Sequence, residues 1–374
     1  MGWPGAYCPD MPTRFAHPQP PRPGAAHARA KVFPVFLPLA GCPGRCIYCD
    51  QPAQTGQAPE PPDAVSARVR AELLARPESS GPVELAFYGG TFTALPQPVQ
   101  HRLLDLAAEL KACGRVSRVR CSTRPDAVTP ALLANLRARG LDLIELGVQS
   151  FQDAALATSG RGYDGALALT ACRVVRAAGL SLGIQLLPGL PGMSPPEGTE
   201  GTEGTEGPER PGGPGGFTRD IALAASLQPE LVRLYPCLVL DHTPLAGLWQ
   251  AGEFSPWPLP ATVDALARAL RVLWAAGVPT ARIGLAEQAG LRVLAGPRHP
   301  ALGQMARARA LFLHIRDLLP TLGAPPQTLF VPRTLLVPRR WQGEVLGQKN
   351  ALKAEYAGLG LTVQAWDEAE FGLR

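Results

Sequence analysis

The stretch that decides the fold is an apolar run followed at once by clustered cysteines: Val32-Phe33-Pro34-Val35-Phe36-Leu37-Pro38-Leu39, then Gly41-Cys42-Pro43-Gly44-Arg45-Cys46-Ile47-Tyr48-Cys49-Asp50. The apolar run predicts a buried strand, and the cysteines follow its end with the spacing C-x3-C-x2-C. Three thiolates can ligate three irons of an iron–sulfur cluster and leave the fourth open to bind another molecule. The alternatives are three unrelated cysteines or part of a zinc site. A zinc site needs a fourth Cys or His at a standard spacing, and the next cysteine is Cys113.

Length and composition indicate a globular α/β protein. A chain of 374 residues can hold one large domain and a smaller appendage, and 46% hydrophobic residues is ordinary for a sizeable core. No apolar run reaches the length of a membrane span, and the start of the chain lacks the apolar segment of a signal peptide. The remaining cysteines are scattered. We therefore expect a cytoplasmic protein with no membrane partner.

The net charge of +5 is carried almost wholly by arginine. One interpretation is a GC-rich genome, which favours Arg, Ala, Pro and Gly codons. The other is a surface for an anionic partner such as RNA. Charge alone does not separate the two.

Strand-like runs alternate with amphipathic helical stretches, which predicts a parallel sheet covered by helices. Strands are expected at 32–39, 83–88, 119–123, 143–148, 182–187 and 231–235, with helices at 99–112, 130–139, 164–178 and 218–227 among those between them. Six βα units suit a partial (βα)6, TIM-like barrel, because a closed barrel needs eight.

Three segments fall outside this pattern. Residues 1–30 are rich in proline and predict an extended N-terminal arm before a core barrel at 31–245. Residues 197–216 repeat Glu, Gly and Thr and then Pro and Gly, which predicts a solvated loop insertion. Residues 246–374 predict a small C-terminal α/β subdomain, with a helix at 261–276 and strands near 280–285 and 328–331.

Chemistry in parallel α/β barrels gathers at the carboxyl ends of the strands, so polar residues and glycines at these ends are the candidate site residues. Gly89-Gly90-Thr91 follows the second strand, where two glycines let the backbone approach a ligand closely; a tight turn is the plain alternative. Arg124 follows the third strand and can pair with a carboxylate of a ligand or form a structural salt bridge.

The later strand ends carry further candidates. Gln149 follows the fourth strand, and Arg161 lies just downstream of it. Gln185 lies in the fifth strand, before the apolar stretch 186–192 that suits an adenine face. Cys237 follows the sixth strand and is either a buried structural thiol or a group near the substrate. No catalytic side chain is assigned from the sequence.

These motifs resemble those of the radical S-adenosylmethionine (SAM) enzymes related to the catalytic subunit of Elongator, with a radical SAM core of the MiaB/NifB-like kind. The resemblance rests on C-x3-C-x2-C with its tyrosine, Gly-Gly-Thr-Phe, Ser-Thr-Arg-Pro-Asp, Glu-Leu-Gly-Val-Gln-Ser, Ser-Gly-Arg-Gly-Tyr and Leu-Pro-Gly-Leu-Pro-Gly. Val-Arg-Leu-Tyr-Pro and Leu-Ala-Gly-Pro-Arg-His-Pro extend it over roughly residues 30–305.

The resemblance implies a [4Fe–4S] cluster on Cys42, Cys46 and Cys49, with SAM bound to the open iron. Reductive cleavage of SAM then gives methionine and a 5′-deoxyadenosyl radical, with an electron donor such as flavodoxin or ferredoxin. We expect the SAM contacts to come from Tyr48, Gly89, Gly90, Thr91, Arg124, Gln149, Arg161 and Gln185.

The departures from the Elongator subunit are also informative. That subunit has a longer gap between its first two cluster cysteines and a C-terminal acetyltransferase domain, whereas some seventy residues follow Gln304 here. The sequence therefore resembles a short bacterial branch without that domain, and we expect no acetyltransferase activity.

Three functions remain open at this level. The first is a radical enzyme on RNA, tRNA foremost, with no DNA partner. The second is a radical enzyme on a small molecule, similar to oxygen-independent coproporphyrinogen oxidase. The third is a carrier that binds a cluster without catalysis. The strand-end Gly, Arg and Gln residues argue against the carrier, because a carrier needs only the cysteines.

Overall fold

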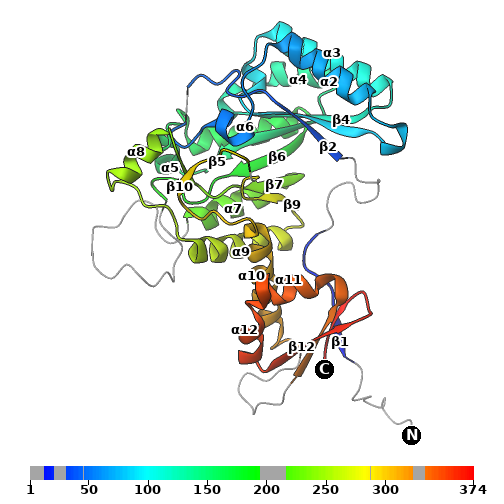
Figure 1. Cartoon of the computed structure of the whole chain (residues 1–374), viewed down its shortest axis with the longest axis vertical. Helices are drawn as coiled ribbons and strands as arrows, with labels where there is room; N and C mark the ends of the chain where they lie inside the picture. Colours follow the sequence, from blue (N-terminus) through cyan, green and yellow to red (C-terminus); the bar gives the residue numbers. More distant parts are fainter. Residues whose placement is uncertain (1–11, 21–30, 45, 194–215, 287, 323–332) are drawn as a thin grey trace.

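The computed structural model describes residues 12–20, 31–44, 46–193, 216–286, 288–322 and 333–374. Within them the chain forms a larger barrel-like unit and a smaller α/β unit (Figure 1). The expected insertion, apart from Gly216, and the candidate strand at 328–331 lie outside the described residues. None of the described helices is long and apolar enough to span a lipid bilayer.

The larger unit is built on one parallel sheet of seven strands, in the order β2-β3-β4-β5-β6-β7-β9. Their bounds are β2 Lys31–Phe36, β3 Val83–Tyr88, β4 Val116–Thr123, β5 Leu143–Gln149, β6 Ser181–Leu186, β7 Leu231–Leu234 and β9 Thr280–Ile283. The end strands β2 and β9 do not pair with each other, so the sheet curls without closing. The expected partial TIM-like barrel is confirmed.

The sheet has one strand more than the sequence predicted. β9 pairs with β7 in parallel, although its residues were expected in the C-terminal subdomain beyond residue 245. The sequence did not place this strand in the barrel because it is short, Thr280–Ile283, and none of its side chains is fully buried. Its apolar pattern is therefore weak. A separate two-stranded ribbon of β8 (Val239–Leu240) and β10 (Val293–Ala295) lies after β7 and β9 in the chain.

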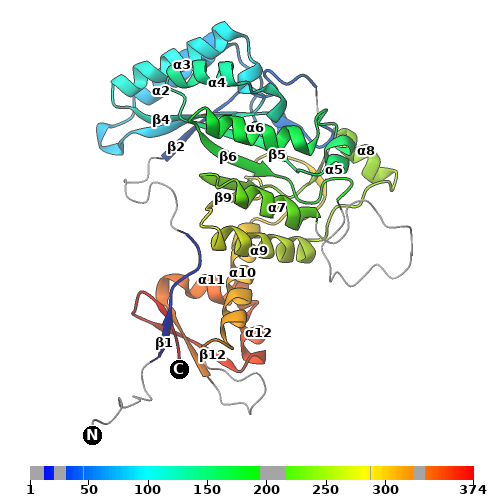
Figure 2. The same ribbon diagram turned by 180° about the vertical axis from the view of Figure 1, so that it is seen from behind.

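Helices cover the outer face of the sheet (Figure 2). Their bounds are α2 Pro62–Leu74, α3 Gln97–Ala112, α4 Pro130–Ala138, α5 Asp153–Thr158, α6 Gly165–Ala177, α7 Gly216–Ser226 and α9 Leu259–Ala275, with α1 Gln51–Thr55 and α8 Pro244–Gln250 in the loops. Short 3-10 turns lie at Glu78–Ser80, Phe92–Ala94, Pro125–Ala127, Arg339–Trp341 and Gln348–Asn350. Side-chain caps start several helices; the hydroxyl of Thr129, for example, accepts a hydrogen bond from the amide of Leu132.

Residues alternate between the two faces of each strand, and this alternation separates core from cavity. In β5, Ile144, Leu146 and Val148 are fully buried on one face. Glu145 and Gln149 lie on the other face and line an internal cavity. The barrel therefore has an apolar shell and a polar interior.

The smaller unit contains a four-stranded sheet in the order β1-β13-β11-β12, with β1 Thr13–Phe15, β11 Arg333–Pro338, β12 Leu361–Trp366 and β13 Phe371–Leu373. Helices α10 Leu302–Leu318, α11 Gln342–Leu346 and α12 Lys353–Gly358 pack with it, and α10 also packs along α9 of the barrel.

The first described residues of the chain belong to this smaller unit. β1 pairs with β13, so part of the segment expected as an N-terminal arm is the edge of the C-terminal sheet. Phe15 stacks on Phe371 with ring centroids 5.2 Å apart, and His17 stacks on Trp341 at 4.1 Å. Proline-rich composition predicted the extended backbone but could not show which sheet would pair with it.

Candidate active site

The cysteine loop lies at the carboxyl end of β2, and all three of its thiols line the internal cavity. Cys46 is buried, whereas Cys42 and Cys49 are half-buried. The amide of Cys42 donates to the carbonyl oxygen of Leu39 at 3.1 Å, and the amide of Cys49 donates to that of Cys46 at 3.0 Å. These turns fix the loop without using the sulfur atoms.

The Gly-Gly turn after β3 packs directly against the cysteine loop. Gly90 has φ +59°, and a Cβ there would lie 2.1 Å from the carbonyl oxygen of Ala40, so no larger residue fits. The amide of Thr91 donates to the same oxygen at 2.7 Å. Its hydroxyl lies 3.3 Å from the sulfur of Cys42. The glycines thus serve the contact between the two loops.

Gln51, the second residue after the cysteine motif, joins these two loops and was missed in the sequence analysis. Its Oε1 accepts hydrogen bonds from the amides of Leu39 at 2.5 Å and Gly90 at 2.8 Å. One side-chain oxygen therefore satisfies a backbone donor from each loop. The sequence signal was a polar residue two positions after the last cysteine of the motif.

Two buried arginines surround the sulfur of Cys46. Arg161 Nη1 lies 3.1 Å from this sulfur, and Arg161 Nη2 donates to the carbonyl oxygen of Gly147 at 2.5 Å. Arg124 Nη1 lies 3.9 Å from the same sulfur. Its other nitrogens donate to both carboxylate oxygens of Asp126, at 2.9 and 2.7 Å. Arg124 thus forms the structural salt bridge that the sequence left open.

The thiols fit the ligand set of a [4Fe–4S] cluster. Burial, with Cys46 and Cys42 close by, raises the pKa of the Cys49 thiol to about 12, so a bound metal is needed to hold it as a thiolate. Among the described residues the buried hydroxyl of Tyr48 has no hydrogen-bond partner, which fits a site that holds a further polar group. In the described part of the chain no three Cys, His, Asp or Glu side chains converge on one metal ion. A cluster requires less convergence, because each cysteine ligates its own iron.

The residues expected to contact SAM come together. Seven of them line the same cavity as the cysteines: Tyr48, Gly89, Gly90, Arg124, Gln149, Arg161 and Gln185. Thr91 is fully buried behind the cavity wall and contacts Cys42 instead. Gln149 has φ +68°, and its Oε1 accepts from Gln185 Nε2 at 3.3 Å. Contact of these residues with SAM stays a prediction.

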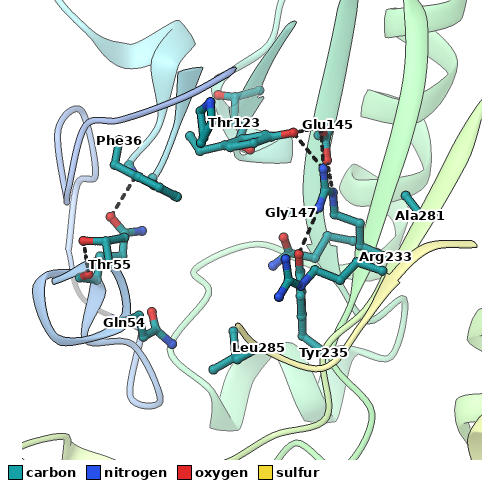
Figure 3. A pocket seen from close by; sticks show the side chains of 18 of the residues that line it. Phe36, Gln54, Thr55, Thr123, Glu145, Gly147, Arg233, Tyr235, Ala281 and Leu285 are labelled. Carbon is teal, nitrogen blue, oxygen red and sulfur yellow. Dashed lines mark hydrogen bonds and ion pairs between the residues drawn. The ribbon is translucent and has the colours of Figure 1, made fainter. Parts of the chain in front are cut away.

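A charged network centred on Glu145, which the sequence analysis missed, lies on the wall of the cavity in the barrel interior (Figure 3). Tyr88 Oη donates to Glu145 Oε1 at 2.7 Å, and Arg233 Nη2 donates to Tyr88 Oη at 2.7 Å. Arg233 also pairs with Glu145 and donates to Tyr235 Oη at 3.2 Å. Arg120 bonds to Glu145. The signal in the sequence was a charged residue at alternate positions of otherwise apolar strands.

The cavity has a volume of about 1280 Å³ and runs through the barrel. Its wall reaches from the cysteines at the carboxyl ends of the strands to Pro82, Ser117 and Pro279, which precede or begin strands. Ordinary ligand pockets measure roughly 300–1,000 Å³, so SAM and part of a second molecule can share this space.

Comparison with known proteins agrees with this architecture. The Radical SAM superfamily model matches residues 36–197, and the Radical_SAM C-terminal domain model matches residues 229–311. A tRNA uridine(34) acetyltransferase of Methanocaldococcus infernus is 26% identical over 281 residues, which cover 65% of this chain and 49% of that protein. The heme chaperone HemW of Mycobacterium tuberculosis is 32% identical over 166 residues, 42% of each chain.

The solved structure of the archaeal Methanocaldococcus infernus Elp3 with an N-terminal deletion has the same fold, with a TM-score of 0.55 and 22% identity. The alignment covers 80% of this chain and 65% of that one. The chain spans about half the length of the acetyltransferases it matches. With both domain models matched, the chain belongs to the radical SAM superfamily, and it is similar to Elongator-like members of that superfamily.

Proposed function

We propose that this chain is a radical SAM enzyme that holds a [4Fe–4S] cluster on Cys42, Cys46 and Cys49 and binds SAM in the adjoining cavity. The observation that carries the proposal is that these three thiols share one cavity wall with seven of the eight predicted SAM contacts. With SAM bound, the cluster supplies a 5′-deoxyadenosyl radical that can remove a hydrogen atom from an unactivated carbon.

The side chains around the thiols have separate tasks. Arg161 and Arg124 lie beside the sulfur of Cys46, where hydrogen bonds to a cluster ligand tune the reduction potential. Gln51 and Thr91 keep the cysteine loop and the Gly-Gly turn together. The network around Glu145 fills the interior below the cysteines and limits how much water shares the cavity.

We propose RNA, tRNA foremost, as the substrate. The proposal is supported by the matched relatives, which are named tRNA uridine(34) acetyltransferases, and by the net charge of +5. A cavity of about 1280 Å³ cannot admit an RNA helix. A single nucleotide therefore has to leave its stack to reach the cysteines, as it does in other enzymes that act on bases. The reaction would take place in the cytoplasm, with a flavodoxin or ferredoxin as electron donor.

A second candidate is a haem-type small molecule, handled either as a substrate or as a bound cargo without SAM cleavage. The matched segment of the heme chaperone HemW favours it. Titration with tRNA separates the two candidates. For RNA, the logarithm of the binding constant should fall linearly with the logarithm of the salt concentration. The slope should be about −0.7 to −0.9 for each phosphate contacted. Binding of haem but not tRNA would favour the second candidate.

The enzyme proposal is tested on anaerobically reconstituted protein with SAM and dithionite. We expect the wild type to form 5′-deoxyadenosine and the Cys42/Cys46/Cys49→Ala variant to form none. The Cys172→Ala variant is the matched control, because Cys172 is a buried cysteine on α6 that does not line the cavity. A wild type that holds iron but forms no 5′-deoxyadenosine, with or without tRNA, contradicts the proposal.

A further inference from the structure

One buried cysteine outside the cysteine loop lines the cavity. Among the described residues, Cys121, Cys172 and Cys237 are buried free thiols. All three belong to the hydrophobic core, and of the three Cys237 alone also lines the cavity. The sequence left open whether Cys237 is structural or lies near the substrate, and its position favours the second.

Backbone hydrogen bonds hold Cys237 at the edge where SAM is expected. Its amide donates to the carbonyl oxygen of Pro188 at 2.9 Å. The neighbouring Leu187 lines the cavity, and its amide donates to the carbonyl oxygen of Gln149 at 2.8 Å. Farther along the same segment, the amide of Leu245 donates to the carbonyl oxygen of Ile47 in the cysteine loop at 2.9 Å. The chain around Cys237 thus connects the ends of β5 and β6 with the cysteine loop.

The Cys237 thiol stays neutral. Burial raises its pKa to about 12, and no charged group near its sulfur contributes to that shift. Cys46 differs, because two arginines lie beside its sulfur. A protonated thiol is a poor nucleophile and a poor metal ligand. Its S–H bond is nevertheless weaker than most C–H bonds, so it can give a hydrogen atom to a carbon radical.

Other side chains indicate that the same cavity holds a polar ligand. The Tyr48 hydroxyl and the Arg120 Nε are both buried and lack hydrogen-bond partners, and both residues line this cavity. Both side chains are more than nine-tenths buried. Buried polar atoms normally have partners, so these two indicate that the cavity lined by Cys237 binds polar groups.

We propose that Cys237 is a catalytic hydrogen-atom donor to a carbon-centred radical of the substrate; this rests on the proposed function. The sulfur–hydrogen bond breaks, a carbon–hydrogen bond forms on the substrate, and a thiyl radical remains on Cys237. One electron from the same low-potential carrier that reduces the cluster, and one proton from solvent, restore the thiol. The substrate leaves with as many hydrogens as it brought, which defines inversion or rearrangement at carbon. SAM is consumed in each turnover.

The first test follows the hydrogen atom. Reconstituted protein in D₂O, given SAM and dithionite and no substrate, carries deuterium on the thiol of Cys237. The 5′-deoxyadenosine that forms should therefore contain one deuterium, read by mass spectrometry. Cys237→Ala should lower the labelled fraction at least tenfold, whereas Cys172→Ala should leave it unchanged. Tyr235→Phe should also retain the label.

The possible outcomes of this labelling experiment separate the role of Cys237 from the proposed function. Unlabelled product from the wild type, or full labelling in Cys237→Ala, overturns the role of Cys237. Loss of label in Tyr235→Phe alone assigns the donor to the tyrosine and overturns it as well. No 5′-deoxyadenosine from any variant instead contradicts the proposed function.

A second test needs neither cluster nor SAM. Methyl methanethiosulfonate is added to the native chain without cluster, and each cysteine-containing peptide is quantified. Burial raises the pKa of Cys237 and of Cys172 to about 12 in both cases, so a difference in labelling reports access. Cys237 should react several-fold faster than Cys172, with the exposed Cys113 as the fast reference. Equal rates for the two buried thiols would show that Cys237 cannot be reached from the cavity and overturn the proposal.

Discussion

The two halves of the barrel interior differ in how their polar groups are satisfied. At the carboxyl ends of the strands, the buried hydroxyl of Tyr48 has no hydrogen-bond partner among the described residues, and the sulfur of Cys46 lies beside the guanidinium groups of Arg161 and Arg124. Below them, the Glu145 carboxylate receives hydrogen bonds or ion pairs from Tyr88, Arg120 and Arg233. The upper half, at the carboxyl ends of the strands, therefore keeps polar groups available for a ligand. In the lower half, around Glu145, the charged side chains pair mostly with one another.

This difference separates the residues that are available to bind a metal or ligand from the residues that stabilise the fold. A buried charge without a partner costs several kcal/mol, so the lower network must form as a unit. The upper groups can stay neutral until a metal or ligand arrives, because thiols and tyrosines are uncharged at neutral pH. Mutations in the lower half should therefore change folding, and mutations in the upper half should change binding.

The largest expected effect is on Glu145. Glu145→Gln leaves Arg233 without its buried carboxylate and should lower the free energy of unfolding by about 3–5 kcal/mol, measured by urea denaturation. Glu109→Gln is the matched control, because Glu109 pairs with Arg70 on the surface, and its unfolding midpoint should not change. A stable Glu145→Gln variant would mean that the lower network is not a folding unit.

The next effect concerns Asp220 of α7, a fully buried carboxylate that receives hydrogen bonds from Ser150, Phe151 and Gln152. Burial raises its pKa to about 6, so the folded chain holds this proton over a range in which the unfolded chain has lost it. The protonated Asp220 side chain therefore makes its full contribution to the free energy of unfolding below about pH 4. This contribution is lost as the pH rises through about 6. The loss amounts to about 3 kcal/mol over about two pH units.

Asp220→Asn isolates this effect. The difference in unfolding free energy between the wild type and Asp220→Asn should shift by about 3 kcal/mol, against the wild type, between pH 4 and 7. Taking the difference cancels the carboxylates and histidines that both proteins share. A constant difference would show that Asp220 ionises as an ordinary exposed carboxylate.

The smallest effect is expected at Gln51, which connects the two upper loops. Gln51→Ala leaves the amides of Leu39 and Gly90 without their acceptor and should cost about 1–3 kcal/mol of stability. Gln51→Glu keeps an acceptor oxygen and should recover most of this loss. If both variants lose iron binding equally while folding normally, the role of Gln51 lies in the metal site and not in joining the loops.

The sequence predicted the site best where a residue type has few structural roles, as with clustered cysteines and paired glycines at strand ends. Three cysteines at the end of an apolar strand, and glycines after the next strand, were placed correctly at one cavity. Strong apolar runs predicted the first six strands. The seventh, Thr280–Ile283, is short and half-exposed, so its pairing with β7 depends on contacts that the local pattern does not encode.

Side-chain partners were less predictable. Arg124 lies at the cavity as expected, but its pairing with Asp126 became visible only once the chain was folded. Glu145 and Arg233 are 88 residues apart, and nothing local marks them as partners. Likewise, β1 pairs with β13 at the other end of the chain, which composition could not predict.

The central claim is that the cysteine loop holds a cluster with one iron open to SAM. Electron paramagnetic resonance of the reduced, reconstituted protein tests it most directly. We predict a [4Fe–4S] signal that changes when SAM is added and that is absent from the Cys42/Cys46/Cys49→Ala variant. A signal that does not respond to SAM, or an intact cluster in that variant, would contradict the account.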